Sequence, residues 1–365
     1  MILYASESHR DDEMAVRQLG QLSLADSLVS RHGKSSVTLD RLDELIDWPK
    51  VAAELSCLRA SRYGAPGYPP LMMLKALLLQ QWYGLSDPGV EDALVDRLSF
   101  RRFIGLALDE AGPDHSTVSR FRKGLVDHGL SEKVFAEVTR QIDARGLILR
   151  RGTMVDATLV EAQVKRPKKP KSDEPRVGQE AETAAAADAA PAPSASDKPE
   201  RPASKLVLSP TDPEASWAKK GHQRYFGYKG HVAVDYLSGI IRRARLTTAS
   251  VADTSMCDEL IMGDEAAVYA DKAYDTKARR AWLKAAGIKD RIAHRPNKHH
   301  PLSRRQEQRN AGISYRRAGV ERIFAIGKRL MGWRRVRYIG LARNAAHFDL
   351  ICTAINLRRL VVLAT

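Results

Sequence analysis

The chain has 365 residues, of which 44% are hydrophobic and 28% charged, and its formal net charge is +15. This length predicts two or three domains, and this composition is typical of a globular protein with a sizeable core. The longest largely apolar run, 71–79, is far shorter than the roughly 20 residues of a membrane span, and the polar N-terminus does not resemble a signal peptide. Three scattered cysteines exclude a disulfide framework and a zinc cluster, so we expect a cytoplasmic location and no membrane partner.

The positive charge is concentrated in one C-terminal segment. Residues 276–343 contain 20 Lys and Arg but only three acidic residues, so they carry the whole basic excess. A field of this density attracts polyanions, which predicts nucleic acid as a partner and association with the nucleoid. The alternative is a basic surface that serves only solubility.

The first 150 residues are predicted to form an all-α DNA-binding region. Leucines at helical spacing recur up to residue 60, and a Gly/Pro-rich break at 61–70 precedes a buried helix that ends near Tyr83. Two short helices follow, over 90–98 and from Ser99, and Asp114 or Ser116 caps a further basic helix. This order is typical of a helix-turn-helix near 99–125, although a purely structural helix fits the same pattern. Its candidates for DNA contact are Thr117, Arg120, Arg122 and Lys123.

A second region, 151–365, alternates predicted strands and helices. Its elements are a strand over 152–160, a hairpin over 225–250, a helix from 253 to 263, a strand over 266–275, a helix over 276–287, a strand over 288–296 and a long helix over 313–335. We therefore expect an α/β fold with a mixed five-stranded sheet and flanking helices. Between the first strand and the hairpin, residues 164–215 hold 9 of the 17 prolines and are predicted to be a disordered insertion.

Three acidic residues stand out by position: Asp156 in the first predicted strand, Asp271 at the end of the fourth, and Glu321 inside the long basic helix. A right-handed crossover places the first and fourth strands side by side, so both aspartates meet at a strand-end crevice that a helix can reach with Glu321. Three converging carboxylates need cations, and their oxygens favour Mg²⁺, with Mn²⁺ as a substitute. The pattern predicts a two-metal site for phosphodiester chemistry. Taken singly, each aspartate is more typical of a turn or cap.

Four motifs give a family resemblance. VDATLVEA around Asp156, YFGYKGHVAVDYLSG in the hairpin, VYADKAYD around Asp271 and RRAGVERIFAIGKR around Glu321 occur in the order seen in bacterial insertion-sequence DDE transposases of the insertion-sequence-five (IS-five) family, which 151–359 resembles apart from the insertion. Residues 68–125 resemble the helical N-terminal domain of that family. The resemblance implies an RNase H-like core, Mg²⁺-dependent cleavage at transposon terminal repeats, joining of the 3′ ends to target DNA, and a homodimer or larger assembly on DNA.

The C-terminal signature of the family is Tyr, two residues, Arg, three residues, Glu, six residues and Lys. Arg317, Glu321 and Lys328 fit this spacing, which keeps all three on one helix face, so both cations are expected to position phosphates. The tyrosine position falls on Ser314, and Tyr315 follows one residue late as a candidate for phosphate contact. The alternative is a plain surface pair of Arg317 with Glu321.

The remaining candidates are weaker. Arg334 and Arg335 are expected to contact DNA, and Trp333 beside them either stacks on a base or, more in keeping with its type, packs in the core. Asp253 is expected to support the site, and His231 with Asp235 on one strand face fits either a ligand pair or buried structure. The whole pattern predicts a DDE transposase. The alternatives are an RNase H-like nuclease without strand transfer, a non-catalytic DNA-binding derivative, and a basic protein that coats nucleic acid.

Overall fold

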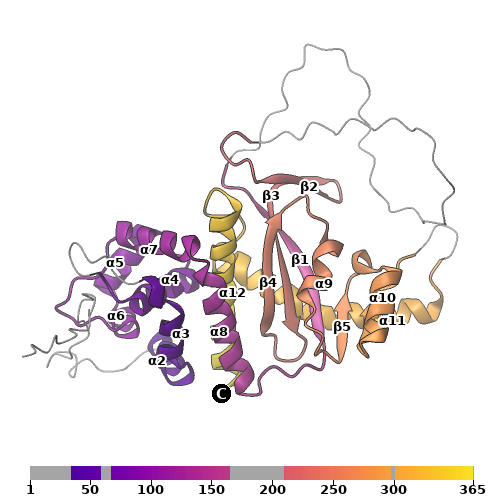
Figure 1. Ribbon diagram of the computed structural model, residues 1–365, viewed down its shortest axis with the longest axis horizontal. Helices are drawn as coiled ribbons and strands as arrows, with labels where there is room; N and C mark the ends of the chain where they lie inside the picture. The colour runs from indigo at the N-terminus through magenta and orange to yellow at the C-terminus, as the bar shows by residue number, and fades with distance from the viewer. Residues whose placement is uncertain (1–33, 59–66, 165–208, 297–300, 365) are drawn as a thin grey trace, which may run out of the picture.

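The computed structural model describes residues 34–58, 67–164, 209–296 and 301–364 (Figure 1). The helix expected around 22–29, most of the insertion expected over 164–215, and the basic loop with His299 and His300 lie outside these ranges. None of the helices in the described ranges is long and apolar enough to cross a membrane.

The N-terminal region is helical, as the leucine spacing predicts. Its elements are α2 (Lys34–Leu45), α3 (Trp48–Glu54), the 3₁₀ turn η1 (Ser56–Leu58), α4 (Pro70–Tyr83), α5 (Asp87–Asp96), α6 (Leu98–Ile104), α7 (His115–Asp127) and α8 (Leu130–Ala144). Helix α4 is buried from Met72 to Trp82, because almost every residue in it is apolar. The connection from α6 to α7 runs from Gly105 to Asp114, which is longer than the compact turn of a helix-turn-helix.

A mixed sheet forms the second region. Its strands are β1 (Thr153–Glu161), β2 (Ser216–Lys220), β3 (Gln223–Asp235), β4 (Ile241–Thr248), β5 (Ala267–Ala270) and β6 (Lys289–Ile292). Their order is β2-β3-β1-β5-β6, with β4 also paired to β3, and β1, β5 and β6 run parallel to one another. The sheet has six strands, so the expectation of five was wrong: β2 is a short strand with two exposed lysines and no apolar alternation that would mark it in the sequence.

Helices cover both faces of this sheet (Figure 1). Helices α9 (Asp253–Leu260) and α10 (Lys277–Ala285) lie over one face, and α11 (Arg304–Leu330) and α12 (Leu341–Leu363) over the other. Because side chains alternate along a strand, Val155 of β1 joins the small core beneath α9, whereas Met154 and Asp156 face α11. This alternation decides which residues reach the site.

Helix α12 joins the two regions. It contacts α2, α4, α7 and α8 as well as β4 and α11, and in Figure 1 it lies between the N-terminal helices and the sheet. One hydrophobic core runs continuously from Leu39 in α2 to Val361 in α12. Polar contacts cross the same boundary, since the indole of Trp82 donates a 2.8 Å hydrogen bond to the carbonyl of Ala354. The helical and sheet regions therefore share one core.

Candidate active site

Asp156, in the first half of β1, lies beside Asp271, which directly follows the carboxyl end of the parallel strand β5. In the parallel pairing of β1 with β5, Thr153 lies opposite Val268 and Met154 lies opposite Tyr269. Asp156 follows Met154 by two residues and Asp271 follows Tyr269 by two, so the two aspartates lie level with each other. By the alternation of the strands, both side chains face α11. The juxtaposition expected from a crossover between these strands is thus present, and it lies where open α/β sheets bind ligands.

The carboxylate of Asp156 is partly withdrawn from solvent. Its side chain is 19% exposed, Oδ1 accepts a 2.9 Å hydrogen bond from the amide of Ala157, and Oδ2 accepts one of 2.9 Å from the guanidinium of Arg317. Burial raises the pKa of Asp156 above its usual range, Arg317 opposes this effect, and the negative charge of Asp271 adds to it. Because burial disfavours the Asp156 anion and Asp271 adds a like charge beside it, this pair calls for a nearby cation.

Helix α11 presents two cations to β1. Besides Arg317 on Asp156, the ammonium of Lys328 donates to the Thr158 hydroxyl at 2.6 Å and to the Leu159 carbonyl at 3.0 Å. Burial lowers the pKa of Lys328, and the charges of Lys220 and Arg334 lower it further. Both cations therefore reach the strand that carries Asp156.

Glu321 occupies the same face of α11 as these two cations. It follows Arg317 by four residues and precedes Lys328 by seven, so helical geometry aligns all three. The Glu321 side chain is exposed. Within the described ranges, no three His, Cys, Asp or Glu residues are close enough to form a metal-binding group. The structure thus brings the two aspartates together and places the glutamate on the facing helix, outside a three-carboxylate cluster.

Tyr315 lies apart from this face. It is 84% exposed and borders a shallow groove with Tyr236, Arg305 and Arg316. Two residues correspond to about 200° around a helix, which turns Tyr315 away from the side of α11 on which Arg317 contacts Asp156. The predicted contact of Tyr315 with phosphate is therefore untested, and the direction of its side chain, away from Asp156, does not support it.

Tyr274, which the sequence analysis did not single out, lies in the small core beneath α9, within electrostatic reach of Asp156. It follows β5 in the 3₁₀ turn η2 (Lys272–Tyr274), and its buried hydroxyl has no hydrogen-bond partner among the described residues. Burial raises the pKa of Tyr274, as do the charges of Asp253 and Asp156. Asp253 is held by an ion pair of 2.7 Å with Lys229. The sequence feature that could have indicated Tyr274 is its place three residues after Asp271 in the motif VYADKAYD, in which only the acidic residue was considered.

His231 and Asp235 have structural roles. His231 is buried with Nε2 2.9 Å from the hydroxyl of Thr247, and burial lowers its pKa to about 4. Asp235 accepts hydrogen bonds from the Arg150 amide and from the amide and hydroxyl of Ser238, so it fixes the turn after β3. The interpretation of this pair as buried structure fits better than a ligand pair.

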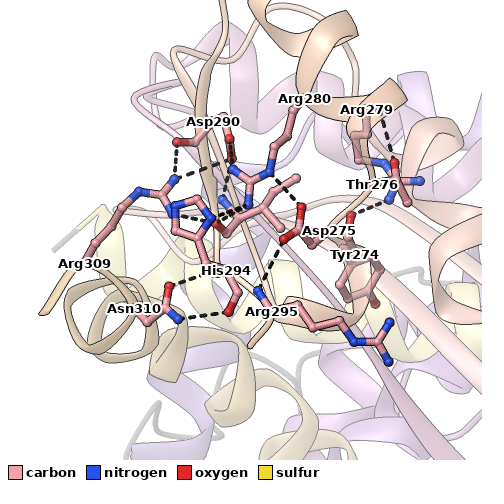
Figure 2. Close-up of polar contacts among 11 residues, drawn as sticks. Tyr274, Asp275, Thr276, Arg279, Arg280, Asp290, His294, Arg295, Arg309 and Asn310 are labelled. Carbon is pink, nitrogen blue, oxygen red and sulfur yellow. Dashed lines mark hydrogen bonds and ion pairs between the residues drawn. The ribbon is translucent and has the colours of Figure 1, made fainter. Parts of the chain in front are cut away.

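A network of charged groups holds the first half of α11 against the end of the sheet (Figure 2). Arg280 of α10 pairs with Asp275 at 2.7 Å and also with Asp290 of β6. Arg309 of α11 donates to the carbonyls of Asp290, at 2.9 Å, and of Ile292, at 2.8 Å. Asp290, one of the three acids in the basic segment, thus pairs with two of its arginines, Arg280 and, at 3.6 Å, Arg309.

Asn310 completes this connection. Its amide nitrogen donates to the His294 carbonyl at 3.0 Å, and its oxygen accepts from the His294 amide at 2.8 Å (Figure 2). The loop after β6 is thereby fixed to α11 two turns before Arg317. The network sets the position of the helix that carries Arg317 and Glu321.

The predicted DNA-contacting residues of α7 divide into two groups. Asp114 caps this helix by accepting from the Thr117 amide at 2.6 Å, while Arg120 and Lys123 are exposed. The Arg122 side chain is only 11% exposed, pairs with Asp87 of α5, and lies 5.0 Å over the ring of Tyr338. Arg122 therefore joins α7 to its neighbours, and its contact with DNA stays a prediction that this arrangement does not favour.

Trp333 is a core residue. It is 2% exposed and stacks on Phe348 with ring centroids 4.5 Å apart, and Gly230 makes room for it, since a Cβ there would lie 2.4 Å from the indole. Stacking on a base was therefore the wrong alternative. The neighbouring Arg334 and Arg335 are exposed, and Arg335 lies 3.5 Å from Glu161.

Two family models match the chain, one described as "Transposase domain (DUF772)" over residues 24–124 and one as "Transposase DDE domain" over residues 149–357. No solved structure matches it. The second match covers more than half of the sequence and includes Asp156, Asp271 and Glu321. The mixed sheet with helices on both faces agrees with the RNase H-like fold of such transposases. The chain therefore belongs to the transposase DDE domain family.

Proposed function

We propose that this protein is an insertion-sequence DDE transposase of the IS-five type. It binds the terminal repeats of its element, cleaves phosphodiester bonds there and transfers the freed 3′-hydroxyl ends to target DNA. The observation that carries the proposal is the pair formed by Asp156 within β1 and Asp271 directly after the parallel β5, two residues beyond the registered pair of Met154 and Tyr269, which faces a helix with basic residues and Glu321. In this proposal residues 1–150 bind DNA and residues 151–365 form the catalytic domain.

The donor groups fit divalent metal ions. Two neighbouring carboxylates offer the oxygen ligands that Mg²⁺ prefers, and burial together with the charge of Asp271 makes an unneutralised Asp156 carboxylate unfavourable. We assign two Mg²⁺, for which Mn²⁺ can substitute, to Asp156, Asp271 and Glu321. When bound, such ions activate a water or 3′-hydroxyl and stabilise the leaving oxygen.

The surrounding side chains bind and orient the DNA. Arg317 can exchange its contact with Asp156 for a phosphate, which its planar guanidinium can bind through two donors. Lys328 supplies a second positive charge beside the same strand. Arg120, Lys123 and Arg334 are exposed and offer further phosphate contacts. Two transposon ends must be held together, so we infer that the protein acts as a dimer or larger assembly on DNA.

The deciding experiment is cleavage of a labelled duplex that carries the element's own end. The wild type is compared with Asp271→Asn, and Asp96→Asn, which changes an exposed acid on α5, is the control. We expect Mg²⁺-dependent cutting that leaves a 3′-hydroxyl, followed by joined products, in the wild type and control only. Cutting without joining would indicate a nuclease. End-specific binding without cutting in Mg²⁺ or Mn²⁺ would indicate a non-catalytic derivative.

A further inference from the structure

The hairpin formed by β2 and β3 carries an unusual set of charges. Its two-residue loop begins at Gly221, whose φ of +60° suits the first position of a tight hairpin turn. At its base the rings of Trp217 and Phe226 contact each other with centroids 5.2 Å apart, and Phe226 is 2% exposed. The hairpin is therefore anchored in the core while its tip reaches solvent.

The tip places like charges opposite each other. Lys219 pairs in register with Arg224, and both residues are exposed, as are the adjacent Lys220 and His222. Within the described ranges, neither Lys219 nor Arg224 forms an ion pair with a carboxylate. Directly opposed like charges destabilise an antiparallel pair, so the hairpin keeps this arrangement at a cost in stability.

The base of the hairpin meets the end of the catalytic strand. Gly227 of β3 is paired both with Ser216 of β2 and with Glu161 of β1. Glu161 also forms a β-bridge with Arg335, and its amide donates to the carbonyl of Arg334 at 3.2 Å. Three segments that are distant in sequence thus converge where β1 ends. The lowered pKa of Lys328, to which Lys220 and Arg334 contribute, agrees with this proximity.

We propose that the β2–β3 hairpin is an arm that binds the phosphate backbone of duplex DNA next to the cleavage site. The inference rests on the proposed function, because the DNA must lie across β1 and α11. The charges of the hairpin continue the series of Arg317, Lys328 and Arg334 away from Asp156. This continuity favours the DNA that occupies the active site over an acidic protein as the partner. Such contacts hold the duplex without reading its sequence.

A single substitution separates DNA binding from hairpin stability. Lys219→Glu places a carboxylate opposite Arg224, which turns a repulsive cross-strand pair into an attractive one. We expect the melting temperature to stay level or rise, while affinity for the duplex falls roughly threefold to tenfold at physiological salt and the slope of log K against log salt becomes shallower by about one. Arg224→Glu should act in the same way.

The matched control is Lys289→Glu, an equal charge change at an exposed position of β6, on the opposite edge of the sheet from β2. Binding is measured by fluorescence anisotropy of a labelled terminal repeat across a salt series, with Asp271→Asn included as a cleavage-deficient protein. A loss confined to the hairpin variants supports the arm. Wild-type binding with equal effects of Lys219→Glu and Lys289→Glu would overturn the arm and leave the transposase assignment intact. Absence of DNA binding by the wild type would overturn both, and Lys219→Gln repeats the test if the charge reversal impairs folding.

Discussion

At the scale of single residues, the contact between Arg317 and Asp156 links stability to activity. Both side chains are mostly buried, so removing the guanidinium leaves a carboxylate with no cation at 2.9 Å. We expect Arg317→Gln to lower the free energy of unfolding by about 2 kcal/mol. We also expect it to lower the rate of DNA cleavage by about 10²–10³-fold, because a side chain that binds the phosphate is lost.

A double-mutant cycle checks this explanation. If the cost of Arg317→Gln comes from the unpaired carboxylate, the double variant with Asp156→Asn should regain most of the stability in urea unfolding, although it stays inactive. DNA affinity measured alongside separates binding from cleavage. An equal loss of stability in the single and double variants would show that Arg317 stabilises the fold through other contacts.

Three neighbouring basic residues of α7 should give different phenotypes. Arg120→Ala and Lys123→Ala remove exposed charges, so we expect weaker duplex binding, a salt slope shallower by about one for each, and unchanged stability. Arg122→Ala leaves the Asp87 carboxylate without its paired cation, with Gln80 as its remaining donor, and should cost roughly 2–4 kcal/mol in urea unfolding. Loss of DNA affinity in a stably folded Arg122→Ala protein would contradict this division.

At the scale of elements, the sequence predicts strands and buried helices better than polar ones. Strands β1 and β5 and the body of α11 were predicted because β-branched runs and an apolar stripe mark them. Helix α11 begins at Arg304 and not near 313, since residues 304–312 are polar or small and only the capping box of Ser303 and Gln306 marks the start. The proximity of the two aspartates was predictable from the order of the strands. The position of Tyr315 was not, because it follows the tyrosine position of the family signature, Ser314, by one residue, and one residue turns a side chain by about 100° around a helix.

The network that holds α11 could not be predicted, because Arg280, Asp290 and Asn310 meet only in the folded chain. We expect Asn310→Ala to cost about 1–3 kcal/mol, since it leaves the backbone amide and carbonyl of His294 without these partners. It should also slow cleavage at saturating DNA, because the helix that carries Arg317 and Glu321 is less firmly placed.

Ser303→Ala is the matched control for this variant. It removes the cap of the same helix at a cost of about 1 kcal/mol but leaves the contact with His294 in place. Cleavage rates and urea unfolding are measured for both proteins. If the two variants slow cleavage equally, the rate follows general stability and not the position of α11.

At the scale of the whole molecule, α12 makes the two regions one folding unit. Its residues pack into the core of the N-terminal helices and also against β4, so we expect both regions to unfold together. Asp349 lies on this helix. Burial raises its pKa to about 7, Glu132 of α8 adds to the effect, and Arg245 of β4 opposes it. The pKa of Asp349 thus depends on charged residues of both the helical region and the sheet region.

The sign of the resulting pH dependence follows from proton binding. In the unfolded chain Asp349 has an ordinary pKa of 3.8 and is ionised above about pH 5, whereas the folded protein keeps it protonated until about pH 7. The folded state binds more protons in this window, so its stability falls as the pH rises through it. The measured quantity is the free energy of unfolding of Asp349→Asn minus that of the wild type. We expect this difference to be larger at pH 8 than at pH 5, by on the order of 2 kcal/mol in favour of the variant. Urea unfolding at both pH values measures this, with the exposed Asp96→Asn as control. If the stability of the wild type and of Asp349→Asn depends on pH in the same way, the Asp349 carboxyl is already ionised in the folded protein between pH 5 and pH 8. The packing of α12 between the two regions would then accommodate its charge.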